Sequence, residues 1–157
     1  MINAVKQLDN NASLWRVFEV IKAHYAKTPI DNTSEAASLL PVQCMLSLLS
    51  LLDYAAYSSF EKSCLQTAQT YWLENAKELE SDMMQQCNTL ATQIDYRSKQ
   101  QNYRKICLAQ VLSIDSDHFN DLPDFFETIY LAGLPVDTIL ETVRCCFAHI
   151  SELEHLS

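Results

Sequence analysis

The chain contains a single glycine, Gly133, among its 157 residues. Glycine adopts positive φ more readily than any other residue, and tight hairpins, left-handed turns and phosphate-binding loops depend on it. A chain almost without glycine has few places for a sheet of hairpins, a nucleotide cradle or a nucleophile elbow. The sequence therefore predicts an all-α fold and disfavours functions that use those glycine-dependent sites.

Length and hydrophobicity predict one helical domain over residues 1–157. Hydrophobic residues make up 48% of the chain and charged residues 20%, which is typical of a protein with a packed core. The most apolar run, residues 44–52, is far shorter than the ~20 residues of a membrane span. The first residues lack the basic start and long apolar stretch of a signal peptide. We expect a cytoplasmic protein without a transmembrane segment. Its six cysteines are expected to be free thiols, and four of them, Cys44, Cys64, Cys87 and Cys107, are expected to pack in the core.

Apolar residues at helical spacing predict a compact bundle of six to eight helices. The expected helices start with residues 10–27, capped by Asn10, Asn11 or Ser13, and a short one over 33–40. A third, from Pro41 to about residue 57, is apolar on nearly every side, which is typical of a helix buried at the centre of a bundle.

The second half of the chain continues the helical pattern. Ser58 or Ser59 caps a helix that extends to about residue 79, and Ser81 or Asp82 caps the next. The polar stretch 97–104 leaves open whether residues 81–114 form one helix or two. A loop over 115–121, a helix opened by Leu122-Pro123 and ended by Gly133, and a final helix over 136–153 complete the expected fold.

Negative charge is concentrated in the C-terminal third. The net charge is −9; from Ile106 onward there are nine acids and one base, whereas residues 1–105 carry eleven acids and ten bases. Such a surface repels phosphate backbones and favours a basic partner. We expect no nucleic-acid binding.

Two features predict where a partner binds. Four of the eleven bases fall within residues 97–105 beside Tyr103, and Trp15 lies off the apolar stripe of the first helix, where it can anchor an interface. The predicted partner-binding residues are Arg97, Lys99, Tyr103, Arg104, Lys105 and Trp15. The partner is expected to be another protein or a second copy of this chain.

Carboxylates and thiols supply the alternatives. Glu74, Glu78 and Asp82 are spaced i, i+4, i+8, as in helical Mg²⁺-dependent nucleotide hydrolases, but such a site needs a second, facing row of acids that the sequence lacks. Cys145 or Cys146 with His149 forms a possible nucleophile and base, but their predicted mid-helix position lacks the dipole that activates a thiol, and Cys146 is assigned to the core. The sequence predicts no cofactor, no metal and no catalytic residue.

The small, acidic, glycine-poor helical build is similar to that of secretion chaperones and adaptors. The tail Ser151-Glu-Leu-Glu-His-Leu-Ser157 resembles the glutamate-bearing C-terminal signals of type IV secretion effectors. These resemblances imply a bacterial secretion-system effector, which would be translocated into a host cytosol, or an effector adaptor or chaperone. We expect a non-enzymatic protein-interaction module, with a small metal-dependent enzyme and a homo-oligomeric structural protein as alternatives.

Overall fold

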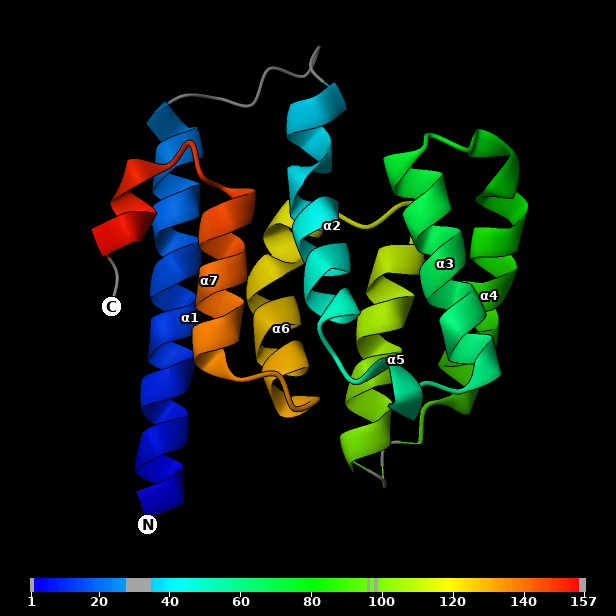
Figure 1. Cartoon of the computed structure of the whole chain (residues 1–157), viewed down its shortest axis with the longest axis horizontal. Coiled ribbons are helices and arrows are strands. Elements are labelled where there is room, and N and C mark those ends of the chain that lie inside the picture. Colours follow the sequence, from blue (N-terminus) through cyan, green and yellow to red (C-terminus); the bar gives the residue numbers. More distant parts are fainter. Residues whose placement is uncertain (1, 28–34, 96, 98, 156–157) are drawn as a thin grey trace.

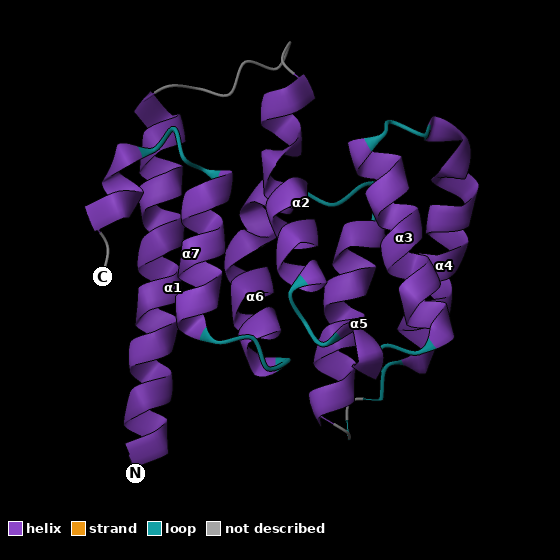
Figure 2. Ribbon diagram, in the orientation of Figure 1, coloured by secondary structure: helices purple, strands orange, loops and turns teal. Residues whose placement is uncertain are grey.

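The computed structural model describes residues 2–27, 35–95, 97 and 99–155, with the backbone alone at 2–11, 35–38, 99–101 and 155. In this part of the chain every regular element is helical, and no strand is present (Figure 2). The all-α prediction and the predicted number of helices are confirmed. The α-helices are α1 (Ile2–Lys27), α2 (Glu35–Ser50), α3 (Ser59–Leu73), α4 (Glu80–Gln93), α5 (Lys99–Leu112), α6 (His118–Leu131) and α7 (Val136–Cys146).

Helix α2 lies between two groups of helices. Figure 1 shows α1, α6 and α7 on one side of α2, and α3, α4 and α5 on the other. α2 packs against α3, α5, α6 and α7, and a second contact between α5 and α6 joins the two groups. The core is therefore continuous along the long axis of the molecule.

The sequence of α2 explains its central place. Its fully buried side chains include Cys44, Met45, Leu48 and Leu49, which point to several sides of the helix. The predicted central helix is confirmed, but its predicted bounds are wrong. The expected short helix and the helix from Pro41 are one element, because burial of these side chains outweighs the backbone hydrogen bond that Pro41 removes. The predicted start of the short helix, residues 33–34, lies outside the described residues.

After α2 the chain turns sooner than predicted. The helix ends at Ser50, and the carboxylate of Asp53 accepts a hydrogen bond from the Ala55 amide (3.1 Å) to start the 3-10 turn η1 (Tyr54–Ala56). Short polar side chains such as Asp stabilise turns in this way and compete with helix continuation.

The outer ends of α1 and α7 also differ from the predictions. α1 begins at Ile2, so the predicted caps at residues 10–13 lie inside the helix, where asparagine costs only a few tenths of a kcal/mol. α7 ends at Cys146, because Phe147 leaves helical geometry (φ −112°, ψ 43°) with its ring fully buried. The chain continues as the 3-10 turn η3 (Ser151–His155), and Arg144 holds it by donating from Nε to the Leu153 carbonyl oxygen (3.1 Å).

Residues 81–114 form two helices. The turn between α4 and α5 is held by Asn102, whose side chain accepts from the Asp95 amide (3.0 Å) and donates to the Asp95 carbonyl oxygen. α3 ends at Leu73 rather than near residue 79, and Asn75 takes a positive φ of 56° before the 3-10 turn η2 (Lys77–Leu79) leads into α4. The predicted cap at Ser81 or Asp82 therefore lies in the first turn of α4, two or three residues after the N-cap position, Leu79.

Gly133 ends α6 as predicted. Its φ is +119°, and the amides of Gly133 and Leu134 donate to the carbonyl oxygens of Tyr130 (3.0 Å) and Ile129 (3.2 Å). This paired pattern is the Schellman motif, which requires the conformation that glycine adopts without strain. The start of α6 was predicted four residues late, because Asp117 caps the helix and Pro123 lies inside it.

Candidate partner-binding surfaces

Trp15 is half-exposed on α1. The residue is 51% exposed, and its indole packs edge-on against Phe18, with ring centroids 6.1 Å apart. Phe18 is buried and contacts Phe119 of α6 at 5.6 Å. The indole therefore packs on a buried aromatic ring while about half of the residue faces solvent, which is typical of tryptophans that anchor interfaces.

A shallow hollow of about 50 Å³ adjoins this indole. Leu14 and Trp15 line it from α1, and Pro123 and Glu127 line it from α6. We call these four residues the Trp15 hollow. Its walls are apolar except for the exposed carboxylate of Glu127, so it combines an aromatic surface with a negative charge.

The basic stretch 97–105 lies elsewhere. Figure 1 shows α1 at one end of the long axis, while α5 begins in the other half of the molecule. Arg97 is exposed, and Tyr103 and Lys105 are partly buried. Lys99 begins α5, where only its backbone is described. The predicted binding residues thus belong to two separate surfaces.

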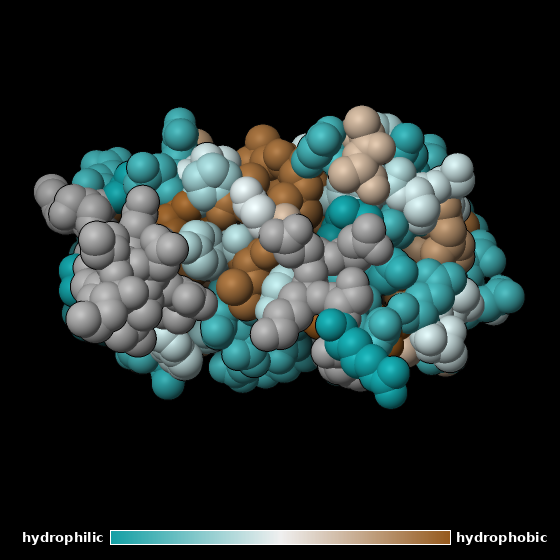
Figure 3. Space-filling model, turned by 90° about the horizontal axis from the view of Figure 1, so that it is seen from below, coloured by the Kyte–Doolittle hydropathy of each residue, from teal (hydrophilic) through white to brown (hydrophobic). Residues whose placement is uncertain are grey.

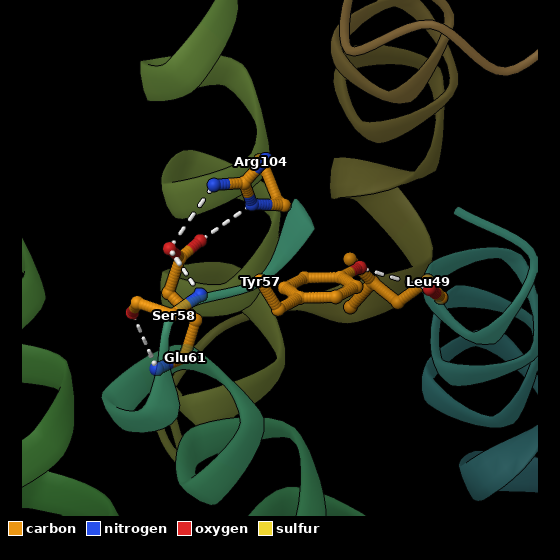
Figure 4. Close-up of polar contacts among 5 residues, drawn as sticks. All are labelled: Leu49, Tyr57, Ser58, Glu61 and Arg104. Atoms are coloured by element: carbon orange, nitrogen blue, oxygen red, sulfur yellow. Dashed lines mark hydrogen bonds and ion pairs between the residues drawn. The ribbon is translucent and has the colours of Figure 1, made fainter. Parts of the chain in front are cut away.

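Arg104 is engaged inside the molecule. Its Nε lies 2.5 Å from Oε2 of Glu61, and its Nη2 donates to Oε1 over 3.0 Å (Figure 4). Glu61 is only 2% exposed and begins α3 through a capping box, in which the Ser58 amide donates to its carboxylate and its own amide donates to Ser58 Oγ (both 3.1 Å). The Arg104 guanidinium also lies 5.1 Å from the centre of the Tyr57 ring, whose hydroxyl donates to the Leu49 carbonyl oxygen (2.9 Å). Arg104 therefore ties α5 to α3 and the end of α2.

The electrostatics of this ion pair follow from its contacts. Burial by itself raises the pKa of Glu61, but hydrogen bonds from Arg104 and Ser58 outweigh it and hold the pKa below its ordinary value. The hydrogen bond to Glu61 correspondingly raises the pKa of Arg104. Both groups stay charged at neutral pH, so the ion pair holds α5 against α3 and stabilises the fold.

The three carboxylates predicted for a metal-dependent enzyme, Glu74, Glu78 and Asp82, do not lie on one helix. Glu74 caps the end of α3, Glu78 lies in η2 and Asp82 lies in α4; all three are exposed. The backbone break at Asn75 removes the i, i+4, i+8 spacing on which the hypothesis depends. Within the described residues, no group of three or more His, Cys, Asp or Glu side chains is placed to hold a metal ion.

His149 belongs to an aromatic cluster that the sequence did not indicate. Its Nε2 lies 3.0 Å from the Tyr25 hydroxyl, and its ring lies edge-on to His24 at 5.3 Å. Tyr25 in turn packs against Phe119 at 5.8 Å. The contact joins α1 to the segment after α7 across 124 residues of sequence, so no local spacing could have revealed it.

Exposed apolar side chains also occur away from α1. Seen from below, the molecule has a mostly hydrophilic surface with a hydrophobic area near the middle of the view (Figure 3). Leu51, which follows α2 directly, is 51% exposed, the same fraction as Trp15. Because the two residues are equally exposed, Leu51 serves as a matched comparison for Trp15.

No protein-family model, curated protein or solved structure matches the chain. Among the described helices, none combines the length and apolar character needed to cross a bilayer.

Proposed function

We propose that the chain is a non-enzymatic protein-interaction module, and that the Trp15 hollow receives a lysine or arginine side chain of a partner protein. The observation that carries the proposal is the half-exposed indole of Trp15 beside the exposed carboxylate of Glu127. An indole face attracts a cation by about 0.5–2 kcal/mol, depending on desolvation, and a neighbouring carboxylate adds a charge-assisted hydrogen bond.

Charge on the surrounding surface favours the same partner. Asp124, next to Pro123 on α6, is exposed, and the chain from residue 106 onward carries nine acids against one base. Arg16 and Glu19 flank Trp15 on α1 with opposite charges that offset each other. A basic segment would therefore be steered toward α6, and raising the salt concentration should slow its association.

The secretion resemblance suggests a setting for this interaction. An adaptor or effector would bind a host or bacterial protein through the Trp15 hollow, and the tail from Ser151 would carry the export signal. In the structure Leu153 is buried in η3 while Glu152 and Glu154 are exposed. This part of the proposal is tested by fusing the chain to a translocation reporter and comparing it with the double variant Glu152→Gln and Glu154→Gln, which should lose translocation but not folding.

The interaction is tested by affinity purification from native lysate with four variants. Trp15→Ala and Glu127→Gln should each deplete a common partner at least fivefold. The controls Leu51→Ala and Glu141→Gln remove an equally exposed leucine and an exposed carboxylate on α7, and should retain that partner. Equal recovery with all four variants would contradict the proposal, as would loss of the partner with the controls alone.

Self-association is the alternative outcome. The other half of the molecule carries the exposed Arg97, so a second copy could offer the basic side chain. Light scattering over a wide concentration range separates the two cases. A dimer that dissociates in Glu127→Gln would identify the partner as another copy of this chain, and a monomer throughout would leave a different protein as the partner.

A further inference from the structure

A hollow of about 370 Å³ lies where α3 passes the end of α2, and it shares no residue with the Trp15 hollow. One wall is a single face of α3, because its residues follow the helical spacing i, i+3, i+4, i+7. The other wall is the last residue of α2 and the first residue of η1. We call this hollow the Lys62 pocket; it is lined by Lys62, Leu65, Gln66 and Gln69 of α3, Ser50 of α2 and Tyr54 of η1. Its volume lies within the range of small-molecule sites, about 300–1,000 Å³.

Lys62 supplies a positive charge to this pocket. Its ammonium nitrogen lies 4.7 Å from the centre of the Tyr54 ring, which attracts the cation and restrains the flexible side chain. The neighbouring carboxylate, Glu61, is buried and already paired with Arg104. Within the described residues Lys62 itself forms no ion pair with a carboxylate. Its charge therefore lacks a counter-charge in that part of the chain, although the net charge of the chain is −9.

The amide side chains of the pocket supply hydrogen-bond donors. Gln69 Nε2 donates to Ser50 Oγ (3.2 Å), and Ser50 Oγ donates to the Leu46 carbonyl oxygen (2.9 Å). These two bonds orient the Gln69 amide, whose second N–H remains to donate to a ligand. Gln66 is exposed and carries a further pair of N–H groups. No described residue that lines the pocket is acidic.

From this arrangement we infer that the Lys62 pocket binds a small organic carboxylate. The carboxylate would accept hydrogen bonds from the Lys62 ammonium and the glutamine amides, and such charge-assisted bonds are stronger than neutral ones. The apolar part of the ligand would lie against Leu65, which is 4% exposed, and against the Tyr54 ring, which is 58% exposed.

The charge of the pocket favours a carboxylate over a phosphate. One ammonium balances the single charge of a carboxylate, whereas phosphate sites typically combine arginines or several backbone N–H groups. Lys62 is the only charged residue in the described lining. The exposed carboxylate of Asp53, adjacent to Tyr54 in the chain, adds repulsion that is larger for a dianion than for a monoanion.

The test is a titration of the folded chain with benzoate at neutral pH, followed in ¹H–¹⁵N correlation spectra. We expect the side-chain amide signals of Gln66 and Gln69 to shift to saturation at millimolar benzoate, while the Trp15 indole signal stays in place. Benzamide, which has the same shape without the charge, should bind roughly tenfold more weakly, and inorganic phosphate should also bind more weakly than benzoate. Benzamide or phosphate that binds as tightly as benzoate would overturn the inference, as would unchanged glutamine signals.

Variants locate the charge that binds the ligand. Lys62→Gln should weaken benzoate binding by roughly fivefold or more. The matched control is Lys77→Gln, because Lys77 also lies over a tyrosine ring, that of Tyr71 at 5.2 Å, but lies outside the pocket. Gln66→Glu places a negative charge at an exposed position of the same wall and should weaken binding without removing a buried contact. Equal benzoate affinity in Lys62→Gln and Lys77→Gln, or wild-type affinity in Gln66→Glu, would contradict the assignment.

A partner protein is the other source of a carboxylate. A glutamate-rich hexapeptide tests it in the same titration, and we expect it to bind no more tightly than benzoate, since the pocket admits little more than one side chain. A peptide that binds roughly tenfold more tightly than benzoate would assign the pocket to an acidic partner chain and overturn the inference of a small-molecule site.

Discussion

At the scale of single residues, Arg104 and Glu61 form an ion pair in which each charge depends on the other. Glu61 is almost completely buried, and its carboxylate accepts from Arg104 and from the Ser58 amide. Removing one partner of such a pair leaves a buried charge without compensation, which costs more than the intact pair contributes. Arg104 therefore stabilises the fold through Glu61, and its guanidinium is already engaged when a partner arrives.

Replacing Arg104 should destabilise the fold strongly. We expect Arg104→Met to lower the free energy of unfolding by about 3 kcal/mol, because Glu61 loses its counter-charge within the core. The control Arg97→Met removes an exposed base from the same basic stretch and should cost less than about 0.5 kcal/mol. Urea unfolding followed by circular dichroism measures both, and equal losses would contradict the assignment.

The same pair should make stability depend on pH. Because the pKa of Glu61 is lower in the folded than in the unfolded chain, its contribution is complete above the unfolded pKa of about 4.3 and is lost as the pH falls through the folded value. The wild type should therefore lose more stability between pH 7 and pH 3 than Glu61→Gln does. Parallel losses in the two proteins would show that Glu61 is not stabilised as a carboxylate.

At the scale of helices, local signals predicted elements well where a single residue sets the boundary. Ser58 with Glu61 forms the capping box at the predicted start of α3, and Gly133 ends α6 at the predicted place. Helix boundaries that depend on tertiary packing were predicted wrongly. Pro41 lies inside α2 because the helix is buried, and α7 ends early because the Phe147 side chain is buried in the core. The ion pair of Arg104 was also missed, since its partner is 43 residues away.

The Gly133 turn gives a prediction at this scale. A Cβ at this position would meet nothing within 4 Å, so Gly133→Ala should be destabilising only through its φ of +119°. We expect a loss of about 1–2 kcal/mol in unfolding free energy. Asn75 is the matched control, because its φ is 56° and Asn75→Gly should leave stability unchanged or raise it. A neutral Gly133→Ala would show that the backbone relaxes there.

At the scale of the whole molecule, α2 makes the two groups of helices depend on each other. A side chain such as Leu48 lies in a core that extends from α1 to α4, so its removal should weaken both groups. The prediction of one domain over residues 1–157 then becomes a prediction of one cooperative transition.

We expect Leu48→Ala to cost about 2–5 kcal/mol while unfolding remains a single transition. Trp72 provides a local probe on the α3–α5 side, because its indole N–H donates to the Val111 carbonyl oxygen (2.7 Å). In a Trp15→Phe background, which leaves Trp72 as the sole tryptophan, the Trp72 fluorescence and the far-ultraviolet dichroism should change at the same denaturant concentration. Two separate midpoints would mean that the groups unfold as independent units.

The proposed function depends on the Trp15 hollow, and the two tryptophans allow one direct test. In a ¹H–¹⁵N correlation spectrum Trp15 and Trp72 each give an indole N–H signal, and Trp72 is internally hydrogen-bonded and serves as the reference. Adding an arginine- and lysine-rich hexapeptide should shift the Trp15 signal to saturation in the wild type, leave Trp72 in place, and have a much weaker effect in Glu127→Gln. A Trp15 signal that stays in place at millimolar peptide, or that shifts equally in Glu127→Gln, would contradict the proposal that this hollow receives a cationic side chain.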